Sequence, residues 1–492
     1  MHYFLGYDFG SSSVKASLTN QKGHLISSAA YPPREMPIHS PKPGFAEQDP
    51  EVWWTCCRKV THLLLKKANI TPDKIKSIGI SYQMHGLVLI DKNGKVLRPA
   101  IIWCDSRAVS TGMNSIPFVG DYTMANCLNY PGNFTASKMR WVIENEPYLY
   151  DKIYKMMLPG DYMAYKMTGD INTTIAGLSE GIMWDFKKHD LAEDLLDHYG
   201  IPRDFIPTLV PVFGIQGRLS NEAASALGLK AGTPLAYRSG DQPNNAMSLN
   251  VLQPGEIAAT GGTSGVVYAI SDQLTGDIQQ RVNSFAHVNY SKEKPGIGIL
   301  LCINGAGILY SWMRSLTGAS QNYVAMEKKA GQVTPGSDGI SILPFGNGAE
   351  RLLGNKSTGA EISGLDFNRH NKAHLIRAAL EGIAFTFVYG IKSMHSLGVQ
   401  TTHIRVGNDN LFQSAIFANT ISQLMNCRIE MMETNGSTGA ATGGQFGAGY
   451  CDSLEQILAS LKLLQVYEPS NKNTDLETSY QRWLEKLNRY LL

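Results

Sequence analysis

The chain has 492 residues, of which 43% are hydrophobic and 17% are charged, and its formal net charge at pH 7 is +2. This length exceeds what one hydrophobic core usually supports, so we expect two domains of roughly 250 residues each. The nearly balanced charge argues against binding to nucleic acid or to an anionic membrane surface, and a small molecule is the expected partner.

Seven cysteines are scattered along the chain without Cys-x-x-Cys spacing. An odd and scattered set argues against a disulfide framework or a zinc site and favours a reducing cytoplasm. Met1 leads almost directly into the first predicted strand, and no apolar stretch approaches the ~20 residues of a membrane span. We therefore expect a cytoplasmic protein without a membrane segment.

Residues 5–18 are predicted to form two strands that are joined by a Gly-Ser-Ser turn. Residues 257–270 repeat the pattern around a Gly-Thr-Ser turn, about half the chain length away, which indicates two related halves. Turns of this kind offer clustered N–H groups and hydroxyls to phosphate oxygens, so two facing turns would hold a polyphosphate. Taken alone, each could equally be an ordinary β-turn.

Asp8 directly precedes the first turn. Its carboxylate could reach a Mg²⁺ ion on the bound phosphate, because Mg²⁺ favours one or two carboxylates together with water and phosphate oxygens. The alternative is that Asp8 only shapes the turn.

A helix is expected over residues 52–68, followed by strands at 75–81 and 86–90. Between these strands, Gln83-Met84-His85-Gly86 presents an amide and an imidazole that suit the hydroxyls of a polyol. Residues 103–107, Trp-Cys-Asp-Ser-Arg, add an aromatic wall and an Asp–Arg pair. The competing interpretation is a buried structural histidine and a surface ion pair.

The two commonest nucleotide-binding loops, Gly-x-x-x-x-Gly-Lys-Ser/Thr and Gly-x-Gly-x-x-Gly, are absent, as is His-Glu-x-x-His. Residues 177–181 read Gly-Leu-Ser-Glu-Gly, which matches the nucleophile elbow of α/β hydrolases. That elbow needs a strand before Ser179 and a helix after it, whereas residues 182–186 read as a further strand. The hydrolase interpretation is therefore disfavoured.

A strand at 235–238 leads through Gly240 to Asp241, and Pro243 opens a predicted helix. Ligands bind at the carboxyl ends of strands in open α/β sheets, so Asp241 could take a proton from a hydroxyl that attacks phosphorus. The alternative is an ordinary N-cap. Residues 248–256 are the expected domain boundary, which predicts domains 1–250 and 251–492 with a cleft between them.

In the second half, the spacing of apolar residues predicts a helix over 374–388 and a strand over 402–406. Residues 435–449 contain six glycines among other small residues. This composition indicates a helix that packs closely on a sheet, or backbone that lies beside a ligand.

Together these segments resemble the FGGY family of carbohydrate kinases over nearly the whole chain. The second family signature is matched in full by residues 360–365 and 374–381, and the first, around 133–144, fits except for Asn133. The other matching segments are Tyr7-Asp8-Phe9-Gly10-Ser11, Glu47-Gln48-Asp49-Pro50, Gln83-Met84-His85-Gly86, Trp103-x-Asp105-x-Arg107, Gly240-Asp241, Gly262-Thr263-Ser264-Gly265 and Gly439-Ala440-Ala441. The resemblance implies an actin-like α/β fold, in which two ribonuclease-H-like domains hold ATP and sugar in the cleft between them.

The resemblance further implies ATP- and Mg²⁺-dependent phosphorylation of D-xylulose to D-xylulose 5-phosphate. Asp241 falls on the catalytic base, and Asp8 falls on the aspartate that places Mg-ATP and binds the metal. The residues expected at the sugar are Gln83, Met84, His85, Trp103, Asp105 and Gln242. Those expected at the nucleotide are Gly10, Ser11, Ser12, Lys15, Gly262, Thr263, Gly305, Gly307, Gly407, Asn408 and Asn410.

Two departures from the family pattern leave alternatives open. Gln242 stands where an asparagine is usual, and residues 405–408 keep one glycine of the usual Gly-Gly-Gly-Ala adenosine motif. A kinase of another ketose or polyol, such as sedoheptulose or ribulose, is one alternative, and a non-enzymatic actin-like nucleotide-binding protein is another. A homodimer is compatible with each of these interpretations.

Overall fold

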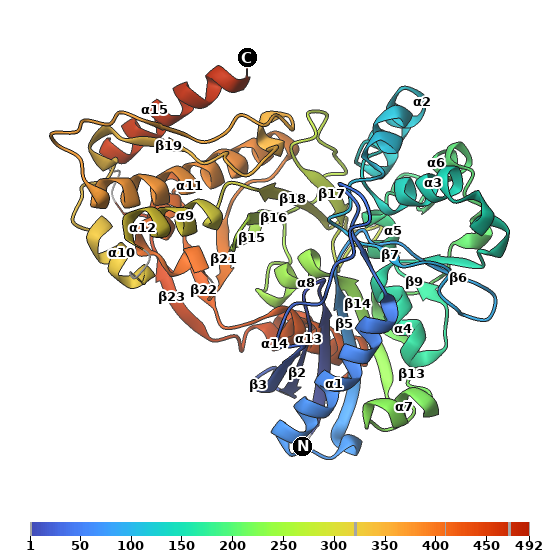
Figure 1. The fold of residues 1–492 in the computed structure, drawn as a ribbon. Helices are drawn as coiled ribbons and strands as arrows, with labels where there is room; N and C mark the ends of the chain where they lie inside the picture. The colour runs from blue at the N-terminus through green and yellow to red at the C-terminus, as the bar shows by residue number, and fades with distance from the viewer. Residues whose placement is uncertain (1, 319–321, 409, 471–473, 492) are drawn as a thin grey trace.

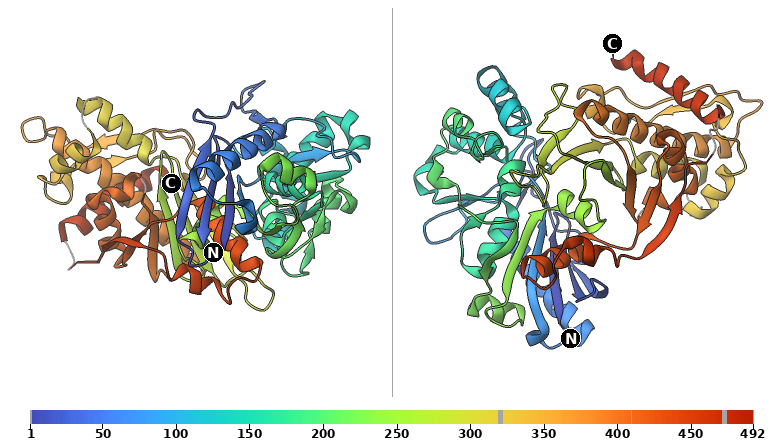
Figure 2. Two further views of the ribbon diagram at one scale, coloured as in Figure 1. Left: turned by 90° about the horizontal axis from the view of Figure 1, so that it is seen from below. Right: turned by 180° about the vertical axis from the view of Figure 1, so that it is seen from behind.

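The computed structural model describes residues 2–318, 322–408, 410–470 and 474–491. Two α/β domains are each built on a mixed β-sheet, and the chain termini lie at opposite ends of the molecule (Figures 1 and 2). The first sheet has the order β13 (Phe213–Arg218), β14 (Pro234–Gly240), β5 (Ile75–Tyr82), β1 (Tyr3–Phe9), β2 (Val14–Asn20), β3 (Leu25–Tyr31). The second has the order β17 (Asn283–Ala286), β18 (Ile297–Ile303), β16 (Gly265–Ser271), β15 (Glu256–Gly261), β21 (His403–Gly407), β22 (Ile429–Met432), β23 (Leu463–Tyr467).

The two sheets share one topology at their centres. In the first sheet, β3, β2 and β1 are antiparallel neighbours, and β5 and β14 continue from β1 in parallel. In the second, β18, β16 and β15 are antiparallel, and β21 and β22 continue from β15 in parallel. The prediction of two related halves, each with the ribonuclease-H-like strand order, is therefore confirmed.

The remaining elements connect or cover these sheets. The helices of the first domain are α1 (Pro50–Ala68), α2 (Val109–Cys127), α3 (Thr135–Asn145), α4 (Pro159–Thr168), α5 (Ile175–Glu180), α6 (Glu193–Tyr199), α7 (Asn221–Leu227) and α8 (Asp241–Ser248). After them come α9 (Gly307–Gly318), α10 (Tyr323–Ala330), α11 (Lys372–Met394), α12 (Ala415–Met425), α13 (Gly436–Gly447), α14 (Leu454–Leu458) and α15 (Thr474–Leu491). Short strands pair as β4 (Glu47–Gln48) with β7 (Ala100–Ile101), β6 (Val88–Ile90) with β8 (Lys155–Met157), β9 (Asn172–Thr173) with β12 (Thr208–Leu209), β10 (Trp184–Asp185) with β11 (Asp190–Leu191), and β19 (Ser341–Leu343) with β20 (Glu361–Ser363).

Side chains of β1 alternate between the two faces of the first sheet. Tyr7 points to α1, where its hydroxyl lies 2.7 Å from the hydroxyl of Thr61. Gly6 points to α13, where a Cβ atom would lie 2.0 Å from the carbonyl oxygen of Ser437. Because the period of a strand is two, Asp8 shares the α13 face with Gly6.

Helix α13 comes from near the C-terminus but packs on β1 and β5 of the first sheet (Figure 1). Gly79 of β5 lies so close that a Cβ atom there would be 1.9 Å from the carbonyl oxygen of Ala440. The small residues after 435 are therefore the sheet-facing side of a helix, as one of the two interpretations predicted. The predicted span 251–492 includes this helix in the second domain, whereas the helix packs on the sheet of the first domain. Glycines on the sheet allow the helix backbone to approach this closely.

Helix α11 is the central helix of the second domain, and it confirms the helix predicted over 374–388. Its Phe387 ring fills the space beside Gly265, where a Cβ atom would lie 2.4 Å from the ring. Among the described residues, 372–397 form one helical segment that is long and apolar enough to span a membrane, but 83% of its most apolar window is buried inside the protein. A buried core helix explains this composition.

Candidate active site

Two aspartates lie near each other at the junction of the domains. Asp241 is the first residue of α8, which packs on β14 of the first sheet and on β15 and β16 of the second. Burial, followed by the negative charge of Asp8, raises the pKa of Asp241 to about 7, although hydrogen bonds from Gln242 act in the opposite direction. Burial also raises the pKa of Asp8. The charge of its cross-strand neighbour Lys15 and a hydrogen bond from Ser81 Oγ (3.0 Å) lower this pKa, but their effect is smaller. Both residues are partly exposed.

The loop after β5 adjoins Asp241. Gln83 and Met84 are buried, and a Cβ atom on Gly240 would lie 2.6 Å from the Cγ atom of Met84. Gly240 directly precedes Asp241, so this close packing fixes the loop against the candidate base. His85 is half-buried, with its ring against Phe134 of the first domain (5.4 Å between centroids) and Phe285 of the second (5.3 Å).

Lys138 joins the two loops that were predicted to bind the sugar. Its ammonium group is buried and donates hydrogen bonds to the carbonyl oxygens of His85 (2.7 Å) and Ile102 (3.1 Å). Burial lowers the pKa of Lys138 to about 7. Segments 83–86 and 102–107 are thus held together by one side chain of α3.

Asp105 is fully buried and already paired. Its carboxylate accepts hydrogen bonds from the backbone N–H of Ala46 and from the guanidinium of Arg107, which also contacts Glu47 (2.7 Å). The predicted contact between Asp105 and the sugar therefore has no support in this geometry, and the alternative of a surface pair is wrong as well. The buried network holds the loop that carries Trp103.

Trp103 and the first turn lie side by side. The indole of Trp103 is 53% exposed and donates to Ser11 Oγ (3.3 Å). Gln48 donates to the carbonyl oxygen of Ser11 (2.7 Å) and accepts a 3.5 Å hydrogen bond from the amide of Gln83. The first phosphate-type turn is therefore linked to both predicted sugar loops.

The two matching turns keep backbone donors available. Gly10 closes the first turn by donating to the carbonyl oxygen of Ser13 (3.1 Å). Within the part of the chain that the structure describes, the N–H groups of Ser11 and Ser12 have no acceptor, and the same holds for Thr263 and Ser264. Free N–H groups in glycine-containing turns are suited to phosphate oxygens.

The second turn contacts the start of α9. The N–H groups of Gly307 and Ile308 donate to the carbonyl oxygens of Gly262 (3.1 Å) and Thr263 (3.0 Å). A Cβ atom on Gly307 would lie only 2.3 Å from the oxygen of Gly262. The helix start therefore positions the turn, and these two amides are already bonded.

Gly305, another predicted phosphate contact, donates its N–H to the carboxyl group of Glu350 (3.4 Å), and so does Asn304 (2.9 Å). Glu350 is buried, and burial raises its pKa. The amide of Gly305 is therefore engaged by the protein itself in this conformation.

A cavity of about 400 Å³ lies beside the second turn. The rings of Tyr310 and Tyr323 stack at 5.1 Å along its wall, and Glu327 is held by Ser414 Oγ (2.6 Å) and by the N–H of Ile416 (2.9 Å). The residues lining the cavity are Gly262, Thr263, Gly307, Tyr310, Ser311, Tyr323, Val324, Glu327, Leu411, Gln413 and Ser414. Its size and position suit the nucleoside part of a nucleotide.

The predicted adenosine segment lies next to this cavity rather than in its wall. Gly407 ends β21, and Asn408 accepts a hydrogen bond from Gln413 (3.2 Å), which does line the cavity. Asn410 begins a short 3₁₀ helix. Residue 409 lies outside the described residues.

The hydrolase elbow is absent from the structure. Ser179 lies inside α5, is 1% exposed and accepts a hydrogen bond from the backbone N–H of Ala286 (2.9 Å). A nucleophile needs an exposed hydroxyl on a strand-to-helix turn, so Ser179 has a structural role.

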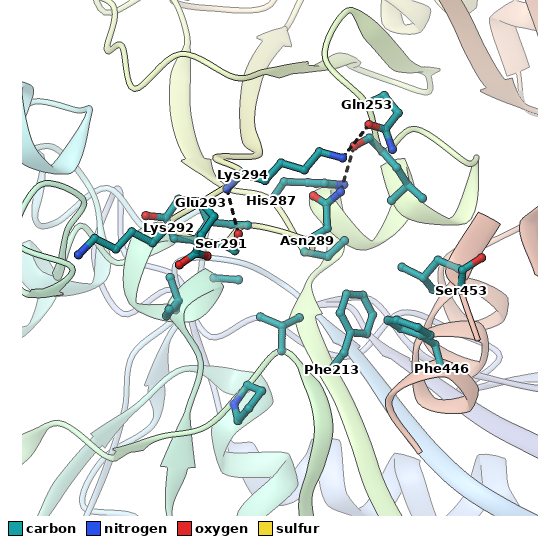
Figure 3. Close-up of a pocket in the computed structure, with 18 of the residues that line it drawn as sticks. Phe213, Gln253, His287, Asn289, Ser291, Lys292, Glu293, Lys294, Phe446 and Ser453 are labelled. Carbon is teal, nitrogen blue, oxygen red and sulfur yellow. Dashed lines mark hydrogen bonds between the residues drawn. The ribbon is translucent and has the colours of Figure 1, made fainter. Parts of the chain in front are cut away.

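A second cavity, of about 920 Å³, is lined by none of the predicted site residues. Figure 3 shows Phe213 and Phe446 together on one wall, and the loop of Ser291 to Lys294 on another, where Lys294 donates to Gln253 (3.2 Å). Neither phosphate-type turn borders it. The candidate site is therefore defined by Asp241 and its neighbours rather than by cavity size.

Comparison with known proteins agrees with this arrangement. The model of the FGGY family of carbohydrate kinases, N-terminal domain, matches residues 3–248, and that of the C-terminal domain matches residues 257–444. The chain belongs to the FGGY family of carbohydrate kinases. It is 29% identical to a xylulose kinase of Escherichia coli (strain K12) and 28% identical to one of Bacillus subtilis (strain 168).

These matches span most of each protein. They cover 95% of this chain and 94% of the E. coli protein, and 93% of this chain and 90% of the B. subtilis protein. A crystal structure of a xylulose kinase from Brucella ovis superimposes with a TM-score of 0.88 at 25% identity and covers 99% of both chains. The predicted family and its actin-like fold are confirmed.

The carboxyl group of Asp8 fits the Mg²⁺ that ATP-dependent FGGY kinases imply, because a divalent cation would stabilise its charged form at a place where burial raises its pKa. Among the described residues, no cluster of three or more His, Cys, Asp or Glu side chains forms a metal site. A cation here would need further oxygen ligands, which phosphate and water supply.

Sequence patterns did not reveal the role of several residues near this site. The stacked rings of Tyr310 and Tyr323 come from two different helices, α9 and α10. Lys138 lies within the first family signature, but the signature does not mark it as a link between loops. Glu180 contacts His85 from a different segment, and its only sequence signal was the disfavoured hydrolase pattern.

Proposed function

We propose that this protein transfers the γ-phosphate of ATP to the terminal hydroxyl of D-xylulose, which yields D-xylulose 5-phosphate and ADP. The observation that carries the proposal is Asp241, a carboxylate with a pKa of about 7 where strand β14 ends between the domains. The names of the full-length relatives support the choice of sugar. Domain 1–250 would bind the sugar, and domain 251–492, apart from α13, would bind the nucleotide.

Asp241 takes the proton of the attacking hydroxyl as the bond from that oxygen to the γ-phosphorus forms. The bond from phosphorus to the bridging oxygen breaks, and its electron pair leaves with ADP. A pKa near 7 leaves about half of the Asp241 carboxyl groups ionised at neutral pH, so the residue can both accept and release a proton. Mg²⁺, held by Asp8, would neutralise charge on the triphosphate when it is bound.

The remaining groups position the two substrates. The free amides of Ser11 and Ser12 on one side, and of Thr263 on the other, would hold phosphate oxygens and stabilise the charge that spreads over them. His85, Met84, Trp103, Gln83 and Gln242 would surround the sugar. The cavity beside the second turn would take the nucleoside, with the residues around Asn408 at its edge.

The test is an ADP-release assay with a panel of ketoses and polyols that includes xylulose, ribulose, sedoheptulose and glycerol. We expect xylulose to give the highest kcat/KM and Asp241→Asn to abolish the stimulation. A higher kcat/KM for another sugar would make this a kinase of that sugar. Binding of ATP without stimulation by any sugar would indicate the non-enzymatic alternative.

Gln242 is the residue with which to probe the choice between sugars. Its amide lies beside Asp241 and is one methylene longer than the asparagine usual at this position. We expect Gln242→Asn to change the ratio of kcat/KM values between xylulose and the other sugars while the KM for ATP stays the same. An unchanged ratio would show that Gln242 does not contact the sugar.

A further inference from the structure

His85 adopts a backbone conformation that L residues rarely adopt. Its φ angle is +59°, in the left-handed region. Such a conformation persists only where the surrounding structure holds it, and it concentrates at functional sites. The contacts that hold His85 in this conformation therefore indicate which ring orientation and protonation the site needs.

Three polar atoms of His85 each form a hydrogen bond with Glu180 or Lys138. The backbone N–H donates to Oε1 of Glu180 (3.1 Å), and the carbonyl oxygen accepts from Lys138 Nζ (2.7 Å). The ring nitrogen Nδ1 lies 2.9 Å from the carbonyl oxygen of Glu180. Glu180 thus holds both the backbone and the ring.

These contacts determine the proton on the imidazole. A carbonyl oxygen only accepts, so Nδ1 must carry the hydrogen in that contact. Burial, followed by the charge of Lys138, lowers the pKa of His85 to about 3, so the ring is neutral at physiological pH. A neutral ring with its hydrogen on Nδ1 has a bare Nε2, which has no partner among the described residues and can only accept a hydrogen bond.

The carboxyl group of Glu180 is enclosed between His85 and the strand that leads to Asp241. Its Oε2 lies where a Cβ atom on Gly240 would approach to 2.6 Å, and the side chain is 1% exposed. Burial raises the pKa of Glu180 well above its usual value, and the negative charges of Asp241 and Asp161 raise it further. The hydrogen bond from the N–H of His85 lowers this pKa but does not cancel the rise. Glu180 is therefore protonated more readily than an ordinary glutamate, and its protonated form places no second negative charge beside Asp241.

We propose that Glu180 is a positioning residue that fixes His85 in the Nδ1–H tautomer, so that Nε2 accepts a hydrogen bond from a hydroxyl of the sugar. The assignment of a sugar to this place rests on the proposed function. The chemistry then selects a ligand hydroxyl at Nε2 over a carbonyl oxygen, because two acceptors facing each other cannot bond. Segment 177–181 therefore positions His85 through Glu180 and does not act as a nucleophile motif.

The test combines kinetics with NMR of the histidine ring nitrogens in the full-length protein. Glu180→Gln keeps an acceptor oxygen for the N–H of His85, and we expect KM for xylulose within threefold of the wild-type value. Glu180→Ala removes it, and we expect that KM to rise at least tenfold with the KM for ATP unchanged. Glu381→Ala is the matched control, because it removes a buried glutamate of the second domain that contacts Arg377 and Ser337.

In ¹⁵N-histidine NMR of the wild type and of Glu180→Gln, we expect His85 to have an unprotonated Nε2 that does not titrate between pH 5 and 8. Glu180→Ala keeps the backbone carbonyl oxygen that accepts from Nδ1 but removes the acceptor of the His85 backbone N–H. We therefore expect the ring to lose its fixed orientation toward that oxygen and a mixture of tautomers to appear. A protonated Nε2 in the wild type would overturn the proposal, as would a Glu180→Gln variant as impaired as Glu180→Ala. If Glu180→Ala does not fold, the wild-type and Glu180→Gln spectra decide.

If the proposed sugar kinase activity is wrong, the experiments give a result that differs from the one that would overturn the role of Glu180. If no sugar is phosphorylated, the kinetic comparison is lost, whereas the NMR spectra of the ligand-free protein still report the tautomer. A single Nδ1–H tautomer would then uphold the role of Glu180 toward His85 while the substrate is sought elsewhere.

Discussion

Ser179 of the first domain accepts a hydrogen bond from the backbone N–H of Ala286 in β17 of the second (2.9 Å). Two residues earlier on β17, Ser284 exchanges two hydrogen bonds with the side chain of Asn129, at 2.7 and 3.1 Å. All of these groups are buried. Strand β17 is therefore one of the places where the two domains are fastened to each other.

Asn129→Ala should weaken the connection between the domains. The change leaves the N–H and carbonyl groups of Ser284 without partners, so we expect the free energy of unfolding to fall by about 2 kcal/mol. Urea unfolding measures the change. The matched control is Asn126→Ala in the last turn of α2, three residues before Asn129, because the side chain of Asn126 donates to the carbonyl oxygen of Tyr122 (2.9 Å) in its own helix. Equal losses in both variants would contradict a special role of the β17 contact.

Asp241→Asn should remove the base without disturbing the site. The amide has the shape of the carboxylate but cannot take the proton, so we expect kcat to fall by roughly 100- to 10,000-fold. Steady-state kinetics measure kcat, and calorimetry should show that sugar binding persists. A variant with near-normal turnover would remove Asp241 from the mechanism.

The pKa of Asp241 also predicts a pH dependence of stability. Its pKa is about 7 in the folded protein against an ordinary value of 3.8, so the folded state holds this proton more tightly than the unfolded state does. The resulting stabilisation is complete below about pH 3.8 and is lost as the pH rises through 7. We therefore expect the melting temperature to fall less between pH 5 and pH 8 in Asp241→Asn than in the wild type, without nucleotide or Mg²⁺.

The control for this measurement is Asp121→Asn, which changes an exposed carboxylate of α2. It should leave the wild-type pH dependence in place. Parallel melting curves for Asp241→Asn and the wild type at both pH values would mean that Asp241 ionises normally.

His85→Ala should affect the sugar and spare the nucleotide. The variant loses the acceptor at Nε2, and one lost hydrogen bond corresponds to about a tenfold increase in KM for the sugar. The KM for ATP should stay within twofold, because the nucleoside cavity is lined by other residues. Steady-state kinetics with each substrate varied in turn measure both values. Equal increases in both would indicate that His85 only maintains the fold.

Gly307→Ala should raise the KM for ATP and spare the KM for the sugar, which is the opposite of the pattern expected for His85→Ala. The new Cβ atom would meet the carbonyl oxygen of Gly262 at 2.3 Å, so the second turn has to move. Overpacking of this size costs about 1–3 kcal/mol, and we expect the KM for ATP to rise by about tenfold or more while the KM for the sugar changes little.

Gly331→Ala is the matched control, since its nearest neighbours would lie at 3.4 Å or more and its backbone is helical. It should leave both constants unchanged. If Gly307→Ala also leaves the KM for ATP unchanged, the second turn does not hold the nucleotide.

The sequence predicted what depends on local patterns. The two hairpins, the position of Asp241 after β14 and the helix that became α11 follow from alternation, helical spacing and turn residues. The helical spacing over residues 52–68 also places Leu63 with the apolar residues of α1, yet Leu63 is 47% exposed. The apolar side of a helix extends beyond the strip that its sheet covers, and single residues at its edge cannot be assigned from spacing.

The parts of the site that depend on distant contacts were not predictable. Glu180 reaches His85 across 95 residues, and Glu350 reaches Asn304 across 46 residues. Asp105 belongs to a recognisable motif, yet its burial depends on Ala46 and Arg107 meeting it in three dimensions. Residue type suggests a role in binding, but only packing shows which carboxylates remain free.

The placement of α13 has a consequence for how the protein is made. Gly6 and Gly79 present a bare strip of backbone that stays uncovered until residues 436–447 have left the ribosome. The first domain is therefore completed almost last, although it is translated first. A chain that stops at residue 250 would lack this cover, and we expect it to be aggregation-prone and unable to fold alone.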